Sequence, residues 1–377
     1  MVSNPIFSSD SQSQKAGDNS NQFQIAHLTI GIDEKRAREI FDEKLNLAIK
    51  DFSDEATRTA TNRINNFENL LIEKMTKVED ALTAFADPSF QVLLLEAQRT
   101  AAASEREFDF ELLSQLMLDR FQRGQNKLIR TGINRAVEII DEISDEALLG
   151  LTAYFVYSNI VVNSSSVETS LNILNNLFKK IVYDKLPEGQ DWLDQLDILS
   201  VIRLIPFSKP TNIRDTIFES LNGLMAIGIS KNSEDLIKAK EKLIENKIPL
   251  NILVDNKFLN DYVRLDVDSR NMIEEIYLTN GITYNIYNSS NPPIRIQLSQ
   301  NQKNVLYEIY DSYKIDSTLT MEIKNKFNVI FESYSELLMI SKWIDNLPFN
   351  FQLTSVGRVI AAANAKRCEP SLPNFDI

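Results

Sequence analysis

Residues 56–85, ATRTATNRINNFENLLIEKMTKVEDALTAF, repeat apolar side chains at intervals of three or four along their whole length. The repeating positions are Ala56, Ala60, Ile64, Phe67, Leu71, Met75, Val78, Leu82 and Phe85. This is the period of an α-helix, and an unbroken helix here would be about 45 Å long at a rise of 1.5 Å per residue. The narrow apolar seam allows two interpretations, a coiled-coil face or a long helix packed across its own domain.

Most of the chain around this stretch has the same helical period. Asp87-Pro88 begins a helix, because proline fits the first turn, where its missing N–H is not needed. Further helical patterns cover residues 88–103, 108–122, 125–143, 145–162, 166–182 and 300–346, and another restarts at Thr211 or Asn212 toward Met225. The sequence therefore predicts a mainly α protein built from multi-helix bundle domains.

Strand patterns in the second half of the chain are short. Residues 281–287 and 294–298 alternate around an Asn-Ser-Ser-Asn-Pro-Pro turn, which predicts a small hairpin or two edge strands. Residues 349–354 form another alternating run that leads into a helix capped by Thr354. Helices followed by a short strand and a further helix predict a small winged-helix-like C-terminal part.

The N-terminus is different in character. Residues 1–20 are rich in Ser, Gln and Asn, so we expect a flexible segment with little to bury. Residues 21–32 then alternate with the two-residue period of a strand. The apolar positions are Phe23, Ile25, Leu28, Ile30 and Ile32, and their phase changes between Ile25 and Leu28, as at a bulge, at a bend or between two strands. We call residues 21–32 the β-arm.

A lone strand in a helical protein leaves both of its edges unpaired, so the β-arm needs partner strands. Copies from other subunits are the simplest source, which predicts a homo-oligomer. The alternative is that the arm docks on its own chain, for instance beside residues 281–298.

The composition is that of an ordinary folded protein. The chain has 377 residues, of which 43% are hydrophobic and 9% aromatic, enough for two or three domains. Cys368 is the only cysteine, which excludes an intrachain disulfide framework and a cysteine-based zinc cluster, and suits a reducing compartment. The first ten residues lack the cationic and apolar regions of a secretion signal. We therefore expect a cytoplasmic protein.

Neither a membrane nor a polyanion is an expected general partner. Residues 148–162 are the most apolar segment, but they are shorter than the roughly 20 residues that a membrane span needs. They also contain Thr152, Ser158 and Asn159, so we expect a buried core helix and no membrane span. The net charge of −13, from 40 basic and 53 acidic residues, opposes non-specific attraction to nucleic acid or anionic lipid.

No pattern in the sequence predicts a catalytic centre, a cofactor or a metal site. The single histidine, His27, lies in the β-arm, where we interpret it as a partly exposed strand or interface residue. Residues 223–228 have the glycine spacing of a phosphate loop. Ile229 and Ser230 stand where that loop requires Lys followed by Ser or Thr, so we interpret the segment as helix.

Acidic residues gather near two helix junctions. They are Asp141, Glu142, Asp145 and Glu146 at one junction, and Asp109 with Glu111 near the other. We interpret them as solvated helix ends, because carboxylates are favourable near helix N-termini. A carboxylate–metal nuclease, whose carboxylates would have to converge in the fold, is the alternative.

One charge pattern does not have a simple structural explanation. Arg120, Arg123, Lys127 and Arg130 are spaced by three, four and three residues, so they share one face if the helix continues past Gly124. Such a face would bind a nucleic-acid backbone or an acidic partner, which makes a nucleic-acid-binding module an alternative function. We favour the other interpretation, that these cations pair with Asp and Glu of this protein.

Three segments resemble a group of bacterial proteins. Ala16-Gly-Asp-Asn-Ser-Asn-Gln-Phe-Gln-Ile25 resembles the GD-N β-arm that precedes helical domains in proteins of phage-defence neighbourhoods. Residues 87–151, with Glu96-Ala-Gln-Arg99 and Glu111-Leu-Leu-Ser-Gln-Leu-Met117, are similar to the helical core of abortive-infection-type proteins. Leu353-Thr-Ser-Val-Gly357 resembles the C-terminal LT-x-x-G segment of that group. The resemblance implies antiviral defence, subunit assembly through the arm and a phage or host protein as partner, and it supplies no catalytic residue.

The predicted organisation has six parts. They are a flexible segment (1–20), the β-arm (21–32), a long helical or coiled-coil-like segment (33–86), a helical domain (87–185), a second helical region with a small hairpin (186–299) and the winged-helix-like end (300–377). We expect a non-enzymatic, self-assembling phage-defence protein that uses no cofactor.

Overall fold

The computed structural model describes residues 32–162, 164–279, 282–284 and 295–375. These residues are mainly helical and carry only short strands, which confirms the predicted fold class. The predicted β-arm lies outside the described residues except for its last residue, Ile32.

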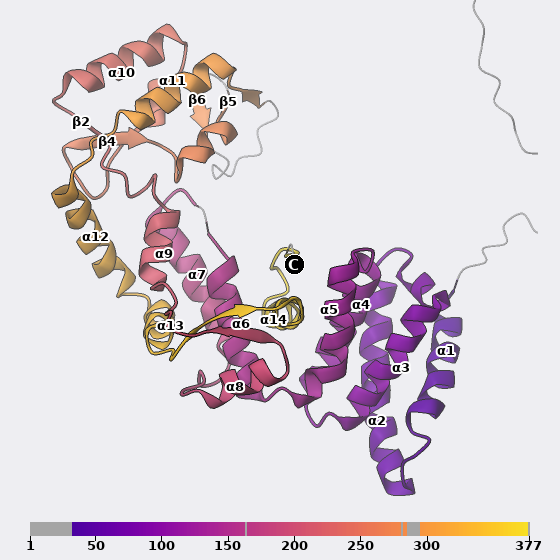
Figure 1. Ribbon diagram of the computed structural model, residues 1–377. Helices are drawn as coiled ribbons and strands as arrows, with labels where there is room; N and C mark the ends of the chain where they lie inside the picture. Colours follow the sequence, from indigo (N-terminus) through magenta and orange to yellow (C-terminus); the bar gives the residue numbers. More distant parts are fainter. Residues whose placement is uncertain (1–31, 163, 280–281, 285–294, 376–377) are drawn as a thin grey trace, which may run out of the picture.

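The first helices of the chain lie side by side at one end of the molecule (Figure 1). They are α1 (Glu34–Ala48), α2 (Asp54–Thr76), α3 (Pro88–Ala103), α4 (Glu107–Arg123) and α5 (Lys127–Ile139). α2 packs on α3 and α4, and its side chains Ile64, Phe67 and Leu71 are fully buried. The apolar face of residues 56–85 therefore packs within its own chain, the second of the two interpretations.

The single helix predicted over residues 56–85 is wrong in its last third. α2 ends at Thr76, and a 3₁₀ helix, η1 (Ala81–Ala86), follows after a turn in which Asp80 has a φ of 57°. Aspartate adopts left-handed backbone more readily than most residues, so the chain changes direction there. A 3₁₀ helix repeats every three residues, so the apolar spacing does not reveal the break.

The middle of the molecule is built around α6 and α14 (Figure 1). Its helices are α6 (Asp145–Asn159), α7 (Val167–Ile181), α8 (Asp191–Ile198) and α14 (Ser355–Cys368), and η2 (Ile140–Glu142) joins α5 to α6. α6 is buried from Ala147 to Val156, as predicted for the most apolar segment of the sequence. Across the ranges that the structure describes, no helix combines the length and the apolar character needed to cross a bilayer.

The predicted cap of the last helix is confirmed, and it holds α14 against a strand. The Thr354 hydroxyl accepts a hydrogen bond from Gly357 N at 3.2 Å and donates to Val201 O at 2.9 Å. A Cβ on Gly357 would lie 2.2 Å from Val201 O, so only glycine allows α14 to approach this closely. The predicted strand is β8 (Asn350–Leu353), which pairs antiparallel with β1 (Ile202–Ile205). These contacts, and the packing of α14 on α5 and α6, attach the predicted winged-helix-like end to the N-terminal helices.

A second hydrophobic cluster, from Ile229 to Ile309, forms the other end of the molecule (Figure 1). Its elements are β2 (Ile229–Ser230), α10 (Glu234–Glu245), η3 (Leu250–Ile252), β3 (Leu253–Asp255), β4 (Tyr262–Leu265), η4 (Arg270–Glu275), β5 (Tyr277–Thr279), β6 (Ile282–Tyr284), β7 (Ile296–Gln297) and α11 (Gln300–Asp311). The buried apolar side chains of α9 (Ile213–Ser220), α12 (Ser317–Phe331) and α13 (Ser335–Asp345) belong to the first hydrophobic cluster, which also includes those of α1–α8 and α14. Phe258, in the turn between β3 and β4, packs into the first cluster and joins the two ends.

Two predictions in this region needed the structure to decide them. β6 and β7 both pair with β5, so they are the two edge strands of a three-stranded sheet, and the hairpin alternative is wrong. Residues 223–228, interpreted as helix, are turn and coil, because α9 ends at Ser220 and β2 begins at Ile229. Gly228 has a φ of 82°, a conformation that a helix does not contain.

Candidate functional site

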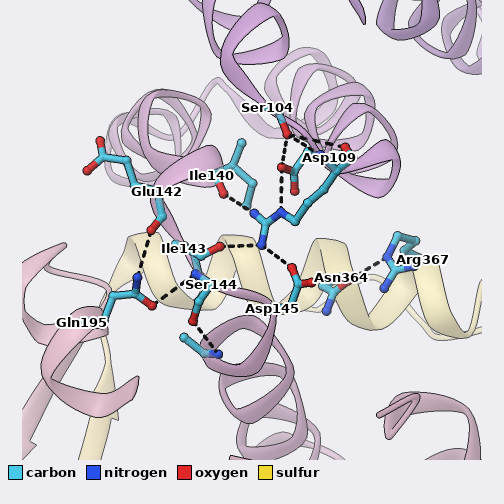
Figure 2. A network of polar contacts seen from close by, with 12 residues as sticks. Ser104, Asp109, Ile140, Glu142, Ile143, Ser144, Asp145, Gln195, Asn364 and Arg367 are labelled. Carbon is cyan, nitrogen blue, oxygen red and sulfur yellow. Dashed lines mark hydrogen bonds and ion pairs between the residues drawn. The ribbon is translucent and has the colours of Figure 1, made fainter. Parts of the chain in front are cut away.

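Carboxylates from the two acidic clusters meet at one arginine. Arg106 precedes α4, and its Nε lies 3.0 Å from Asp109 Oδ2 while its Nη1 lies 2.8 Å from Asp145 Oδ1. The same guanidinium donates to the carbonyl oxygens of Ile143 at 2.5 Å and Ile140 at 2.7 Å. We call these five residues the Arg106 network (Figure 2). It ties the start of α4 to η2 and to the first turn of α6.

Burial sets the electrostatics of the Arg106 network. The Asp109 side chain is fully buried and that of Arg106 is 17% exposed. Burial raises the pKa of Asp109, against the hydrogen bond from Ser104 and the charge of Arg106. Burial by itself would lower the pKa of Arg106, but the charges of Asp109 and Asp145 outweigh it and raise that pKa. The pair is therefore held together in an environment of low polarity.

A second set of hydrogen bonds fixes the turn between η2 and α6 from the side of α8 (Figure 2). Gln195 Nε2 donates to Glu142 O at 3.1 Å, and Gln195 Oε1 accepts from Ser144 N at 3.2 Å. Ser144 in turn caps α6 by accepting from Ala147 N. Backbone groups, and not the Glu142 carboxylate, make these contacts.

The remaining acidic side chains do not converge on a common point. Glu142, Glu146 and Glu111 are exposed, and burial raises the pKa of Asp141, which is only partly covered. Among the described residues, no group of three or more His, Cys, Asp or Glu side chains could hold a metal ion. The arrangement that the structure does show joins Asp109 and Asp145 through a cation, as in a structural ion pair.

The condition for a single basic face over residues 120–130 is not met, because the helix does not continue past Gly124. α4 ends at Arg123, Gly124 follows as its cap, and Asn126 caps the start of α5 by accepting from Leu128 N at 2.9 Å. A glycine followed two residues later by an asparagine is the local signal of this break.

The four cations of this stretch have separate environments. Arg120 Nη2 donates to Ser89 Oγ at 2.8 Å, and burial, then the charge of Arg130, lowers the pKa of Arg120. Arg123 lies 2.5 Å from Asp119 and donates to Phe375 O at 3.1 Å. Lys127 and Arg130 form no ion pair with any described residue. Two of the four cations, Arg120 and Arg123, thus bind groups of their own chain.

Some of the other predicted residues lie outside the described ranges and some lie inside them. Phe23, Ile25, His27, Leu28 and Ile30 lie outside the described residues. Ile32, two residues before α1, packs against the main hydrophobic cluster. Cys368, in the last turn of α14, is partly buried, and burial raises the pKa of its thiol.

Apolar side chains that the sequence analysis did not single out are exposed beside β1. Ile198 and Ile205 are 81% and 39% exposed, and Phe207 is fully exposed with a φ of 65°. Bulky residues rarely adopt this backbone conformation, and a turn usually has Gly or Asn there. Pro206-Phe207 within an apolar run was the available signal, because proline disfavours continuation of a strand.

A protein-family model described only as ":-like" matches residues 31–377. The chain belongs to this family. The match covers both hydrophobic clusters and all described helices, and it begins just after the apolar positions 23–30 of the β-arm. The family's description names no reaction, ligand or partner. No curated protein and no solved structure matches the chain.

Proposed function

We propose that this chain is a non-enzymatic bacterial protein that self-assembles through its β-arm and acts in phage defence. The defence context and the assembling arm come from the sequence resemblance, and the strand period of residues 21–32 supports the arm independently. The protein is proposed to work in the cytoplasm, with a phage or host protein as its partner.

The observation that carries the non-enzymatic part of the proposal is the closure of the Arg106 network. All four polar contacts of the guanidinium go to two carboxylates and two main-chain carbonyls of the same chain. A general acid or a metal ligand needs a carboxylate that can reach a substrate, whereas Asp109 is fully buried behind its arginine. The network is thus suited to fixing three helices in place.

A phage-protection assay with two full-length variants tests the proposal. Asp109→Asn keeps the shape of the side chain and removes its charge, so it would abolish a carboxylate-dependent activity. We expect Asp109→Asn to retain protection, and Ile25→Asp combined with Ile30→Asp to lose it, because charges in a strand interface are costly. Ile237→Asp combined with Ile244→Asp, on the exposed face of α10, is the matched control and should protect normally.

The opposite pattern would contradict the proposal. If folded Asp109→Asn lost protection while the arm variant kept it, the carboxylate would be the functional group and the arm would not. Circular dichroism of each purified variant shows whether it is folded.

A further inference from the structure

The two-stranded sheet of β1 and β8 has one edge that its own chain covers. Along β8, Phe351 O accepts from the Tyr154 hydroxyl at 3.2 Å, and Phe351 N donates to Asn350 Oδ1 at 2.9 Å. Leu353 O accepts from Arg358 Nη1 at 3.4 Å. Both outward groups of Phe351 and the carbonyl of Leu353 are therefore already bonded.

The other edge, along β1, is open at Leu204 but not at Ile202, which is fully buried and whose carbonyl accepts from Arg203 Nη1 at 3.0 Å. Thr354 N donates to Val201 O at 3.0 Å, and bonded pairs alternate along an antiparallel ladder. The register places Leu204 opposite Phe351, so Leu204 falls at a non-bonded pair and its N–H and C=O point away from β8. No hydrogen bond from the described part of the chain reaches either group. Such an edge is a template for a further strand.

Exposed apolar side chains lie next to this open edge. Ile205 is at the end of β1, and Phe207 stands two residues further on, fully exposed in left-handed backbone. Stability alone would favour glycine or a polar residue at such a position, because an exposed phenylalanine there buries nothing and strains the backbone. A strand that pairs with β1 would cover both side chains.

We propose that the open edge of β1 receives the β-arm of a second copy of this chain as a third strand. This inference rests on the proposed assembly and identifies its docking site. Residues 21–31 fit the edge because they alternate apolar and polar side chains and contain no Asp, Glu, Lys or Arg that would have to be desolvated. Residues 21–31 directly precede Ile32, so at about 3.3 Å per extended residue they extend at most roughly 36 Å from it. A third strand also converts a marginal two-stranded pair into a stable sheet.

Variants of the full chain at the edge test the docking site by light scattering. Leu204→Pro removes the outward N–H without touching a ladder bond, and we expect it to lower the mass of the assembly to that of one chain. Phe207→Ser should raise the subunit concentration at which half of the chains assemble by at least tenfold. Ile315→Ser, a matched change at a fully exposed position after α11, should leave the mass unchanged. If Leu204→Pro does not fold, Ile205→Asp takes its place, since Ile205 is already exposed.

Mixing two defective variants then shows whether the contact is between chains. The arm variant Ile25→Asp with Ile30→Asp has an intact edge, and the edge variant has an intact arm. We expect each to have the mass of one chain and an equimolar mixture to form a two-chain species through the remaining arm–edge contact.

The outcomes separate the two proposals. An arm variant that keeps the wild-type mass would contradict assembly itself. An arm variant that loses mass, beside edge variants that keep it, would leave assembly standing and overturn the docking site. A mixture without a two-chain species would overturn docking of the arm on the β1 edge of another copy.

Discussion

Replacing Arg106 tests whether its network is built for stability. Arg106→Gln leaves Asp109 fully buried without its counter-charge, and removal of one partner from a buried pair costs about 3–5 kcal/mol. The carbonyls of Ile140 and Ile143 also lose a charged donor. We expect the free energy of unfolding to fall by about 4 kcal/mol at pH 7. Replacing both members, as in Arg106→Gln with Asp109→Asn, should restore part of it, because no buried charge is then left unpaired.

The loss should depend on pH, with a sign that follows from Asp109. Burial already raises the pKa of Asp109, and Arg106 opposes that rise, so the pKa is higher still in Arg106→Gln. Folded protein then binds the proton more strongly than unfolded protein, and stability is lost as the pH rises through the folded pKa. The deficit relative to wild type should therefore be largest at neutral pH and shrink toward pH 5.

Urea denaturation followed by circular dichroism at the two pH values measures both effects. Arg135→Gln is the matched control, because Arg135 pairs with Glu138 on the exposed face of α5 and such pairs contribute about 0–1 kcal/mol. A loss for Arg106→Gln no larger than for Arg135→Gln, without pH dependence, would refute the structural role. If Arg106→Gln were that stable and still lost phage protection, the Arg106 network would have a functional role.

Three further predictions concern single features of the chain. Gly357→Ala should destabilise the protein by about 3 kcal/mol, because the new Cβ would lie 2.2 Å from Val201 O. Calorimetry should show a smaller change for Gly132→Ala, whose new Cβ would lie 3.2 Å from its nearest atom, Ser355 O. Cys368 should react slowly with Ellman's reagent at pH 7, since burial raises the pKa of its thiol. Both Cys368→Ser and His27→Ala should keep phage protection, and loss of protection in either folded variant would reveal a missed site. Nucleic-acid binding should not change when Arg120, Arg123, Lys127 and Arg130 are all replaced by Gln. Sub-micromolar, salt-dependent binding by the wild type in fluorescence anisotropy, absent from the variant, would contradict this. Each lost phosphate contact would then lower the slope of log affinity against log salt by about 0.9.

Local signals in the sequence were sufficient for helices and their ends. Asp87 followed by Pro88 marks the start of α3, and Thr354 marks the start of α14, because a capping side chain bonds to backbone only two or three residues away. The break between residues 122 and 125 was predicted, whereas apolar residues continued at helical spacing through the turn at Asp80. Periodicity alone therefore extended the helix of residues 56–85 past its end at Thr76.

Contacts between distant residues could not be predicted in this way. β1 is four residues long and finds its partner, β8, about 150 residues later, so its sequence carries little signal of its own. Asp109 is three residues from Arg106, whereas Asp145 is 39 residues away and reaches it only because α5 and η2 pack on α4 and bring the start of α6 close to Arg106. The acidic clusters were visible in the sequence, but the arginine that joins them was not.

The mass of the full chain in solution, measured by sedimentation equilibrium at several concentrations, tests the central claim most directly. The claim is that the β-arm, residues 21–32, assembles copies of this chain. We predict that the wild type has the mass of two or more chains and that a chain with Ile25→Asp and Ile30→Asp has the mass of one. The same mass for both proteins, whether of one chain or of several, would contradict assembly through the arm.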